Sequence, residues 1–162
     1  MSDRPGLAAG PEAPRFSVIV CTRDRPQDIA RCVPSILATV GPSFELIVVE
    51  QSTTDAAERV VAALADPRIV LLRDRSAGKA RGENAAVARA RGDVLAFTDD
   101  DCTVPTDWLR RAWGLLEEDR EAGIIFSAVV AAPHDPNTTF VPTFLPSVRQ
   151  NPRFGIYSVV VQ

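Results

Sequence analysis

The sequence predicts an α/β protein with a mostly parallel sheet that is covered on both faces by helices. Two observations support this fold class. Short runs rich in Val, Ile and Leu lack polar alternation, which is typical of strands buried on both faces. Segments with helical spacing separate the runs, and parallel neighbours need such crossovers. The five runs occupy residues 16–21, 44–50, 68–73, 93–98 and 123–132.

Each helical segment follows one of the first four strands. The first has apolar side chains at helical spacing, and its Pro34 is expected to kink the helix or to lie near its first turns. The second begins with Ser, Thr and Asp, which are helix-capping residues. The third is rich in alanine, and the fourth has Trp108 and Leu109 on an apolar face. The predicted helices lie within residues 26–41, 52–66, 78–92 and 105–123.

Composition limits the class of protein. The 162 residues suffice for one domain, and with 46% hydrophobic and 24% charged residues they are typical of a soluble globular chain. The net charge of −3 gives no reason to expect nucleic acid as a partner. Uncharged runs reach only about a dozen residues, too short for a transmembrane segment. Three widely spaced cysteines indicate reduced thiols, so we expect a cytoplasmic protein, with peripheral attachment at the inner face of the membrane as a further alternative.

The chain divides into three parts. Residues 1–14 are rich in Pro, Gly and Ala, have no apolar core of a secretory signal, and are expected to be a disordered lead-in. Residues 15–132 contain all five predicted strands. Residues 133–162 are interrupted by prolines, and only the final "YSVVVQ" resembles a strand.

Ligands of parallel sheets bind beyond the carboxyl ends of the strands. There, Asp99, Asp100 and Asp101 follow the strand 93–98 directly. In an extended chain Asp99 and Asp101 point to one side and Asp100 to the other. Carboxylates suit Mg²⁺ or Mn²⁺, which take oxygen ligands both from the protein and from substrate phosphates. One side of the triplet is therefore expected to bind a cation and the other a sugar or ribose. A solvated acidic turn that caps the next helix is the alternative.

A basic segment supplies the opposite charge. Residues 68–91 contain seven Arg or Lys against two acids, a formal balance of +5. Lys79 and Arg81, at the start of a helix beside a glycine, could hold a diphosphate or be solvated surface charges. Arg89 and Arg91 are interpreted as solvated charges on a helix face.

The first two strand ends supply further candidates. Glu50 stands where an acid hydrogen-bonds a ribose or a base N–H, and Thr22 could contact the same base. Arg23 and Ser52 lie beside them and are included as candidate nucleotide contacts. The dinucleotide fingerprint and the P-loop are both absent from the sequence, and the single His134 gives little support for a catalytic triad.

Three segments together resemble glycosyltransferase family 2, the inverting nucleotide-sugar enzymes of GT-A fold. "FSVIVCTRDRP" is similar to the family's first strand and turn. "ELIVVEQSTTD" is similar to its second, with Glu50 where Asp is usual. "GKARGENAAVARARGDVLAFTDDDC" is similar to the block that ends in Asp-x-Asp, with Glu83 where Arg is common. The likeness covers residues 16 to 131.

The resemblance implies a GT-A α/β/α sandwich and a metal-dependent transfer, with inversion, from a UDP- or GDP-type sugar donor to a carbohydrate or lipid-linked acceptor. Thr22 and Glu50 would contact the base. Asp99 and Asp100 would meet ribose, sugar or metal, and Asp101 would bind the Mn²⁺ or Mg²⁺ ion.

The acceptor base of the family lies in the second half of its domain, and this chain has no Asp or Glu after Asp135, so no catalytic base is identified. We expect residues 15–132 to be the donor-binding half and 133–162 to be an incomplete, Pro-rich start of the acceptor half, so that the chain is C-terminally truncated. The alternatives are a nucleotide-sugar-binding module without transfer activity and a nucleotidyltransferase.

Overall fold

The computed structural model describes residues 13–76, 78–133, 137, 143 and 156–158. The predicted lead-in at 1–14 and the Pro-rich segment at 133–162 fall largely outside these residues. The chain divides into two compact units, residues 1–109 and 110–162. The candidate site lies wholly in the first.

The first unit is built on a parallel sheet of four strands. The strands are β1 (Phe16–Thr22), β2 (Phe44–Glu50), β3 (Ile69–Arg73) and β4 (Val94–Asp99), in the order β3-β2-β1-β4. The central strands β1 and β2 are almost wholly buried, as their continuous apolar runs predict. In β4, an edge strand among the described residues, exposed positions alternate with half-buried ones.

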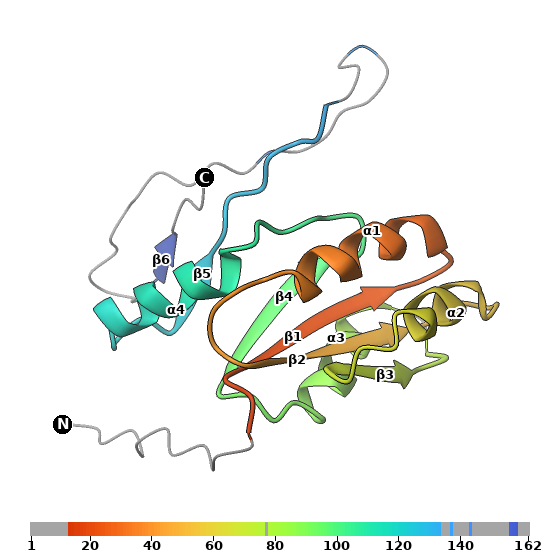
Figure 1. Cartoon of the computed structure of the whole chain (residues 1–162), viewed down its shortest axis with the longest axis horizontal. Coiled ribbons are helices and arrows are strands. Elements are labelled where there is room, and N and C mark those ends of the chain that lie inside the picture. Colours follow the sequence, from red (N-terminus) through yellow and green to blue (C-terminus); the bar gives the residue numbers. More distant parts are fainter. Residues whose placement is uncertain (1–12, 77, 134–136, 138–142, 144–155, 159–162) are drawn as a thin grey trace. The chain divides into compact units, whose positions relative to one another are not determined.

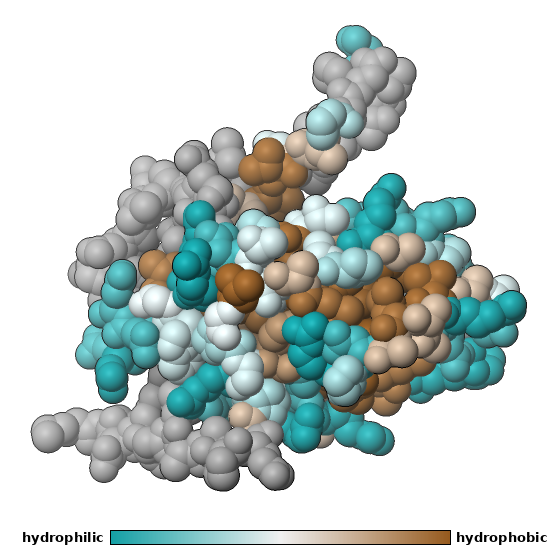
Figure 2. All heavy atoms as spheres, in the orientation of Figure 1, coloured by the Kyte–Doolittle hydropathy of each residue, from teal (hydrophilic) through white to brown (hydrophobic). Residues whose placement is uncertain are grey.

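Helices cover both faces of this sheet, which confirms the predicted α/β class (Figure 1). The crossover helices are α1 (Pro26–Leu37), α2 (Ala56–Ala63) and α3 (Lys79–Val87). α1 and α2 pack against each other, whereas α3 contacts β1 and β2 through Ala86, which joins Ile19, Ile47 and Val49 in the core. In the space-filling view hydrophobic residues gather over the strands β1 to β3, with hydrophilic residues around them (Figure 2).

α1 contains two prolines at different positions. Pro26 is the first helical residue, where a missing N–H costs nothing. Pro34 lies inside the helix, one turn before its end at Leu37. The buried side of the helix is the predicted apolar stripe, Ile29, Cys32, Val33 and Ile36.

A buried carboxylate ties the amino end of the sheet together. The Glu45 side chain accepts hydrogen bonds from the Ser17 hydroxyl (2.7 Å), from the Arg91 backbone N–H (2.7 Å) and from the Arg91 guanidinium (2.8 Å). The Gly92 N–H donates to the Ser17 oxygen at 2.8 Å. Because α3 ends at Val87, Arg91 does not lie on a helix face as predicted, although its side chain is 64% exposed and in that respect solvated as predicted. We call these four residues the Glu45 network.

Gly92 allows this close approach. A Cβ at this position would lie 2.5 Å from the Phe16 carbonyl carbon and from the Ser17 nitrogen, closer than real Cβ atoms come to backbone. A glycine at this position before β4 is thus required by packing against the start of β1. Asp93 adds an ion pair to Arg15 at 2.9 Å.

The second unit corrects the prediction for residues 123–132. The strand there, β5 (Ile124–Phe126), is only three residues long and pairs in parallel with β6 (Ile156–Ser158), in a separate two-stranded sheet. Beyond β5, Val129 forms an isolated β-bridge, and Val129 and Val130 are both exposed. α4 (Trp108–Glu118) begins in the first unit and continues into the second. Over the described residues, no helix is both long and apolar enough to cross a bilayer.

Candidate functional site

A cleft of about 470 Å³ opens at the carboxyl ends of β1, β2 and β4. Three cationic and three anionic side chains line it, so their formal charges cancel. The charged lining residues are Arg23, Arg25, Lys79, Asp99, Asp100 and Asp101. The position follows from the parallel sheet, in which all carboxyl ends meet at one edge.

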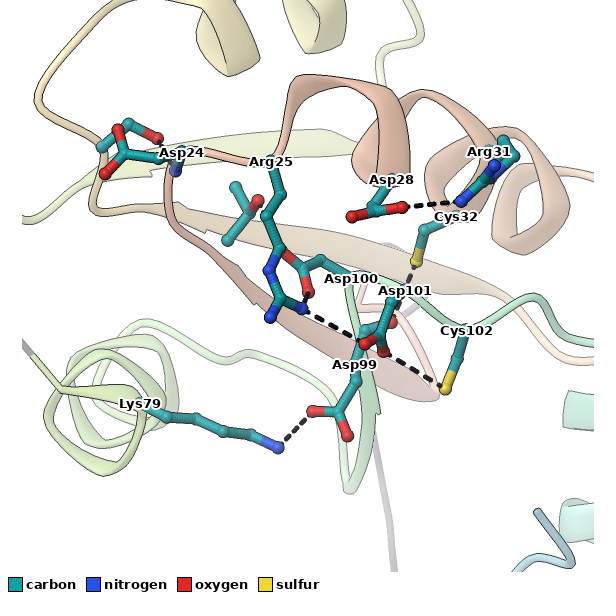
Figure 3. Close-up of polar contacts among 12 residues, drawn as sticks. Asp24, Arg25, Asp28, Arg31, Cys32, Lys79, Asp99, Asp100, Asp101 and Cys102 are labelled. Carbon is teal, nitrogen blue, oxygen red and sulfur yellow. Dashed lines mark hydrogen bonds and ion pairs between the residues drawn. The ribbon is translucent and has the colours of Figure 1, made fainter. Parts of the chain in front are cut away.

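The three aspartates after β4 have different surroundings (Figure 3). Asp100 is buried and accepts a 2.8 Å hydrogen bond from the Thr22 hydroxyl. Asp99 and Asp101 are each about half exposed, and their carboxylate oxygens lie within 4.8 Å of one another and of the Cys102 sulfur. Asp99 ends β4, whereas Asp100 and Asp101 lie in a turn in which the Cys102 N–H donates to the Asp99 carbonyl oxygen at 3.2 Å. The triplet is therefore not the extended chain that the sequence predicted, although Asp99 and Asp101 still approach each other.

Two cations compensate the triplet. Lys79, at the start of α3, pairs with Asp99 across the cleft (Figure 3). Arg25, in the loop before α1, places Nη1 3.3 Å from Asp100 and 3.1 Å from Asp101. The hydrogen bond to Asp99 raises the pKa of Lys79, and the charges of Asp100 and Asp101 raise the pKa of Arg25. Arg25 was not predicted; its position just after a strand end was the available signal.

The loops after β1 and β2 are joined to each other. Asp24 has a positive φ of 56°, a conformation that Asn and Asp tolerate. Its N–H donates to the Ser52 hydroxyl oxygen at 2.7 Å, and its carboxylate accepts from the Thr53 N–H at 3.1 Å. The buried Ser52, predicted as a nucleotide contact, is engaged in this link and does not line the cleft. Arg23, from the same loop, does line it.

Glu50 has an unsatisfied buried oxygen. Its side chain is 1% exposed, and Oε1 accepts a 2.7 Å hydrogen bond from the Ser52 N–H. Oε2 has no hydrogen-bond partner among the described residues, and the Arg73 Nε lies 3.8 Å away. Burying a charged acceptor without a hydrogen bond costs free energy, which the ion pair with Arg73 offsets in part. Glu50 itself does not line the cleft, but its register partner Thr22 does.

Gln51 holds the loop that carries Lys79. Its side-chain amide donates to the carbonyl oxygens of Ser76 (2.6 Å) and Gly78 (3.3 Å). Gly82 lets α3 approach, since a Cβ there would lie 3.1 Å from the Gln51 Nε2. Arg81, which was predicted to act beside Lys79, is exposed and does not line the cleft. Hydrogen bonds from Ser76 lower the pKa of Asp74, and the charge of Arg81 lowers it further.

The side chains present suit a hard divalent cation. Asp99 and Asp101 offer oxygen ligands, which Mg²⁺ and Mn²⁺ prefer. Cys102 is the third nearby group, and burial together with Asp101 raises its thiol pKa. Burial also raises the pKa of Cys21 to about 11 and of Cys32 to about 12, so both are neutral thiols at pH 7.

Comparisons with known sequences agree with this geometry. The model of "Glycosyl transferase family 2" matches residues 17–157. The succinoglycan biosynthesis protein ExoO of Rhizobium meliloti is 37% identical over 101 residues, which cover 62% of this chain and 29% of that protein. The glucosyl-dolichyl phosphate glucuronosyltransferase of Haloferax volcanii is 28% identical over 120 residues, which cover 72% and 38%. The chain therefore spans much less than half the length of these relatives.

Solved structures show the same fold. S. aureus TarS 1–349 in complex with UDP has a TM-score of 0.67 at 22% identity, over 79% of this chain and 38% of that one. The mannosyltransferase PcManGT from Pyrobaculum calidifontis, in complex with GDP-Man and Mn²⁺, has a TM-score of 0.64 at 28% identity, over 71% and 35%. The parallel order β3-β2-β1-β4, the acidic strand end and the family match lead to one conclusion: this chain belongs to glycosyltransferase family 2 and has the GT-A fold.

Proposed function

We propose that this chain binds the donor of a metal-dependent, inverting glycosyltransferase that moves a sugar from a nucleotide diphosphate to an acceptor hydroxyl. The observation that supports it most is the cleft at the strand ends, where three carboxylates face cations from two other elements. Family membership supports inversion and the reaction class. A carbohydrate or lipid-linked acceptor is the class we propose.

The nucleoside end of the donor is assigned to Thr22 and Glu50. Oε2 of Glu50 is paired with Arg73 at 3.8 Å but has no hydrogen-bond donor among the described residues, and a base N–H or a ribose hydroxyl would supply one. Thr22 fixes Oδ2 of the neighbouring Asp100, and Oδ1, which Arg25 contacts at 3.3 Å in the ligand-free cleft, is the atom that would meet ribose or sugar. Because these acceptors are held in place before binding, little ordering free energy is spent on them.

The diphosphate end is assigned to Lys79 and Arg23, with Asp99 and Asp101 as the ligands of the ion. Lys79 stands at the first position of α3, where the positive end of the helix also favours anions. A bound Mn²⁺ or Mg²⁺ ion would neutralise the leaving nucleoside diphosphate. The solved complexes of TarS with UDP and of PcManGT with GDP-Man and Mn²⁺ support this ligand class.

Isothermal titration with UDP and with GDP, each with and without Mn²⁺, tests the proposal. We expect at least one nucleotide to bind about tenfold more tightly with Mn²⁺, about 1.4 kcal/mol. Asp101→Asn should remove this metal dependence while circular dichroism stays unchanged, because Asp101 is half exposed. Glu117→Gln, on the exposed side of α4, is the control. Equal affinities with and without Mn²⁺ in a folded protein would contradict the proposal.

Donor binding without transfer is the second candidate. It is favoured by the described residues, which provide contacts for a donor but no assigned base for an acceptor. Release of labelled sugar from the donor, measured with and without acceptor hydroxyls, separates the two. Turnover identifies an enzyme, and metal-dependent binding without turnover identifies a binding module.

A further inference from the structure

We propose that Arg25 changes partners during donor binding: it neutralises Asp100 and Asp101 in the ligand-free cleft, and it moves to the donor diphosphate when a divalent cation takes Asp101. Arg25 would thereby make metal and nucleotide binding cooperative. This inference rests on the proposed function, because it concerns the same cleft.

The geometry makes Arg25 a competitor of the cation. One nitrogen, Nη1, lies 3.1 Å from an Asp101 oxygen and 3.3 Å from an Asp100 oxygen. Asp101 is also one of the two proposed metal ligands. A cation that binds Asp101 must therefore displace the guanidinium, or bind beside an uncompensated positive charge.

The pair to be broken is weak, whereas its neighbour is firmly held. The side chains of Arg25 and Asp101 are each 53% exposed, and ion pairs so exposed to solvent contribute little stability. Asp100 is only 9% exposed and keeps its hydrogen bond from Thr22. Arg25 can thus leave Asp101 at small cost and turn while Asp100 stays in place.

Lys79 differs from Arg25 in its second partner. Besides Asp99, the Lys79 amine lies 3.8 Å from Glu83, four residues along α3. A cation that takes Asp99 leaves Lys79 with this carboxylate. Both carboxylates that contact Arg25 belong to the triplet itself. A cation that takes Asp101 leaves Arg25 paired with Asp100, and the other N–H groups of its five-donor guanidinium can then join Lys79 in pairing with a phosphate oxygen.

Charge balance explains the cooperativity. The six charged lining residues sum to zero. A divalent cation alone would add two positive charges, and the diphosphate of a nucleotide sugar alone would add two negative ones. Together they restore neutrality, and Arg25 then exchanges a carboxylate for a phosphate oxygen, with which guanidinium pairs well. Such coupling is reciprocal: each ligand raises the affinity for the other by the same factor.

Three dissociation constants test the exchange in the full chain. The first is the dissociation constant of Mn²⁺ alone, measured from the electron paramagnetic resonance signal of free Mn²⁺. The other two are the dissociation constants of the nucleotide without Mn²⁺ and at saturating Mn²⁺, with whichever of UDP or GDP binds the unmodified protein. We expect Arg25→Gln to bind Mn²⁺ alone about fivefold more tightly and the nucleotide with Mn²⁺ about tenfold more weakly. Arg25→Lys should retain part of both effects of the arginine.

Arg23→Gln is the matched control. It removes the same charge from the same cleft, but Arg23 contacts Asp24 (3.8 Å) instead of the triplet. We expect its affinity for Mn²⁺ alone to change less than twofold, whereas its nucleotide affinity should fall because Arg23 is assigned to the diphosphate. An equal gain in Mn²⁺ affinity in both variants would show a general effect of charge and would overturn the exchange.

The result separates this inference from the proposed function. If Mn²⁺-dependent nucleotide binding occurs but Arg25→Gln leaves all three constants unchanged, the exchange is wrong and the proposed function stands. If the folded, unmodified protein shows no Mn²⁺-dependent nucleotide binding, both are wrong. Opposite shifts of the two affinities in Arg25→Gln would support both.

Discussion

Strand β2 carries a buried glutamate at each end, and the two have very different surroundings. Glu45, 3% exposed, accepts hydrogen bonds on both oxygens from Ser17 and Arg91. Glu50, 1% exposed, has one oxygen bonded to the Ser52 N–H and the other without a hydrogen-bond partner in the described part of the chain. They lie five positions apart, about 17 Å along the strand.

The difference separates a glutamate that stabilises the fold from a glutamate that we expect to bind a ligand, within one strand. A buried carboxylate whose hydrogen bonds are complete stabilises the fold, and its loss leaves its partners unsatisfied. A buried carboxylate with a vacant acceptor position costs stability in the free protein, and a ligand that donates a hydrogen bond would recover that cost. The comparison therefore predicts opposite outcomes for substitutions at the two ends.

The largest effect is expected for Glu45→Ala. Removing this carboxylate leaves the Ser17 hydroxyl and two kinds of Arg91 N–H without their acceptor, so the free energy of unfolding should fall by about 3 kcal/mol. Urea denaturation measures it. Glu118→Ala, at the exposed end of α4, should change it by less than about 0.5 kcal/mol. A loss below about 1 kcal/mol at Glu45 would show that the network does not stabilise the fold.

A smaller and different effect is expected for Glu50→Gln. The amide keeps the size of the side chain but removes a buried charge, so the free energy of unfolding should stay the same or rise slightly. Nucleotide affinity in Mn²⁺ should fall about tenfold, because a charged acceptor is replaced by a neutral one. Titration calorimetry and urea denaturation of the same preparation measure both. Lower stability with unchanged affinity would place Glu50 in the same class as Glu45.

The smallest effect concerns pH. Burial opposes ionisation of Glu45, but the hydrogen bonds from Ser17 and Arg91 outweigh it and lower its pKa below the ordinary 4.5. A lowered pKa in the folded state contributes stability above the unfolded value, and this contribution is lost as pH falls through the folded value. The stability difference between the unmodified protein and Glu45→Gln should thus be constant above about pH 5 and narrow below it. A constant difference down to pH 3.5 would refute this assignment.

Patterns within the chain predicted most of the fold. The strands at the centre are continuous apolar runs because both of their faces are buried, and the helices between them follow from apolar spacing. The run at 123–132 has the same composition, yet only Ile124–Phe126 forms a strand, because an apolar run does not by itself supply a pairing partner.

The candidate site was predicted only where a residue type alone indicated its chemistry. The triplet after β4 met that condition. Arg25 did not, because its contacts with Asp100 and Asp101 join residues 75 and 76 positions apart. Glu45, in the segment "FELIVVE", was missed for the same reason, because its partner Arg91 lies 46 positions further along the chain. Such pairings depend on strand register, which the sequence does not show directly.

The position of the Glu45 network also bears on how proteins of this kind can diverge. Substitutions about 17 Å apart with no shared partners usually act additively. The amino ends of the strands can therefore hold the sheet together while the loops at the carboxyl ends change, so selection for a new donor need not be limited by the stability of β1 and β2. We expect Gly92 to tolerate substitution least, because even the methyl group of alanine would force it away from the backbone of β1.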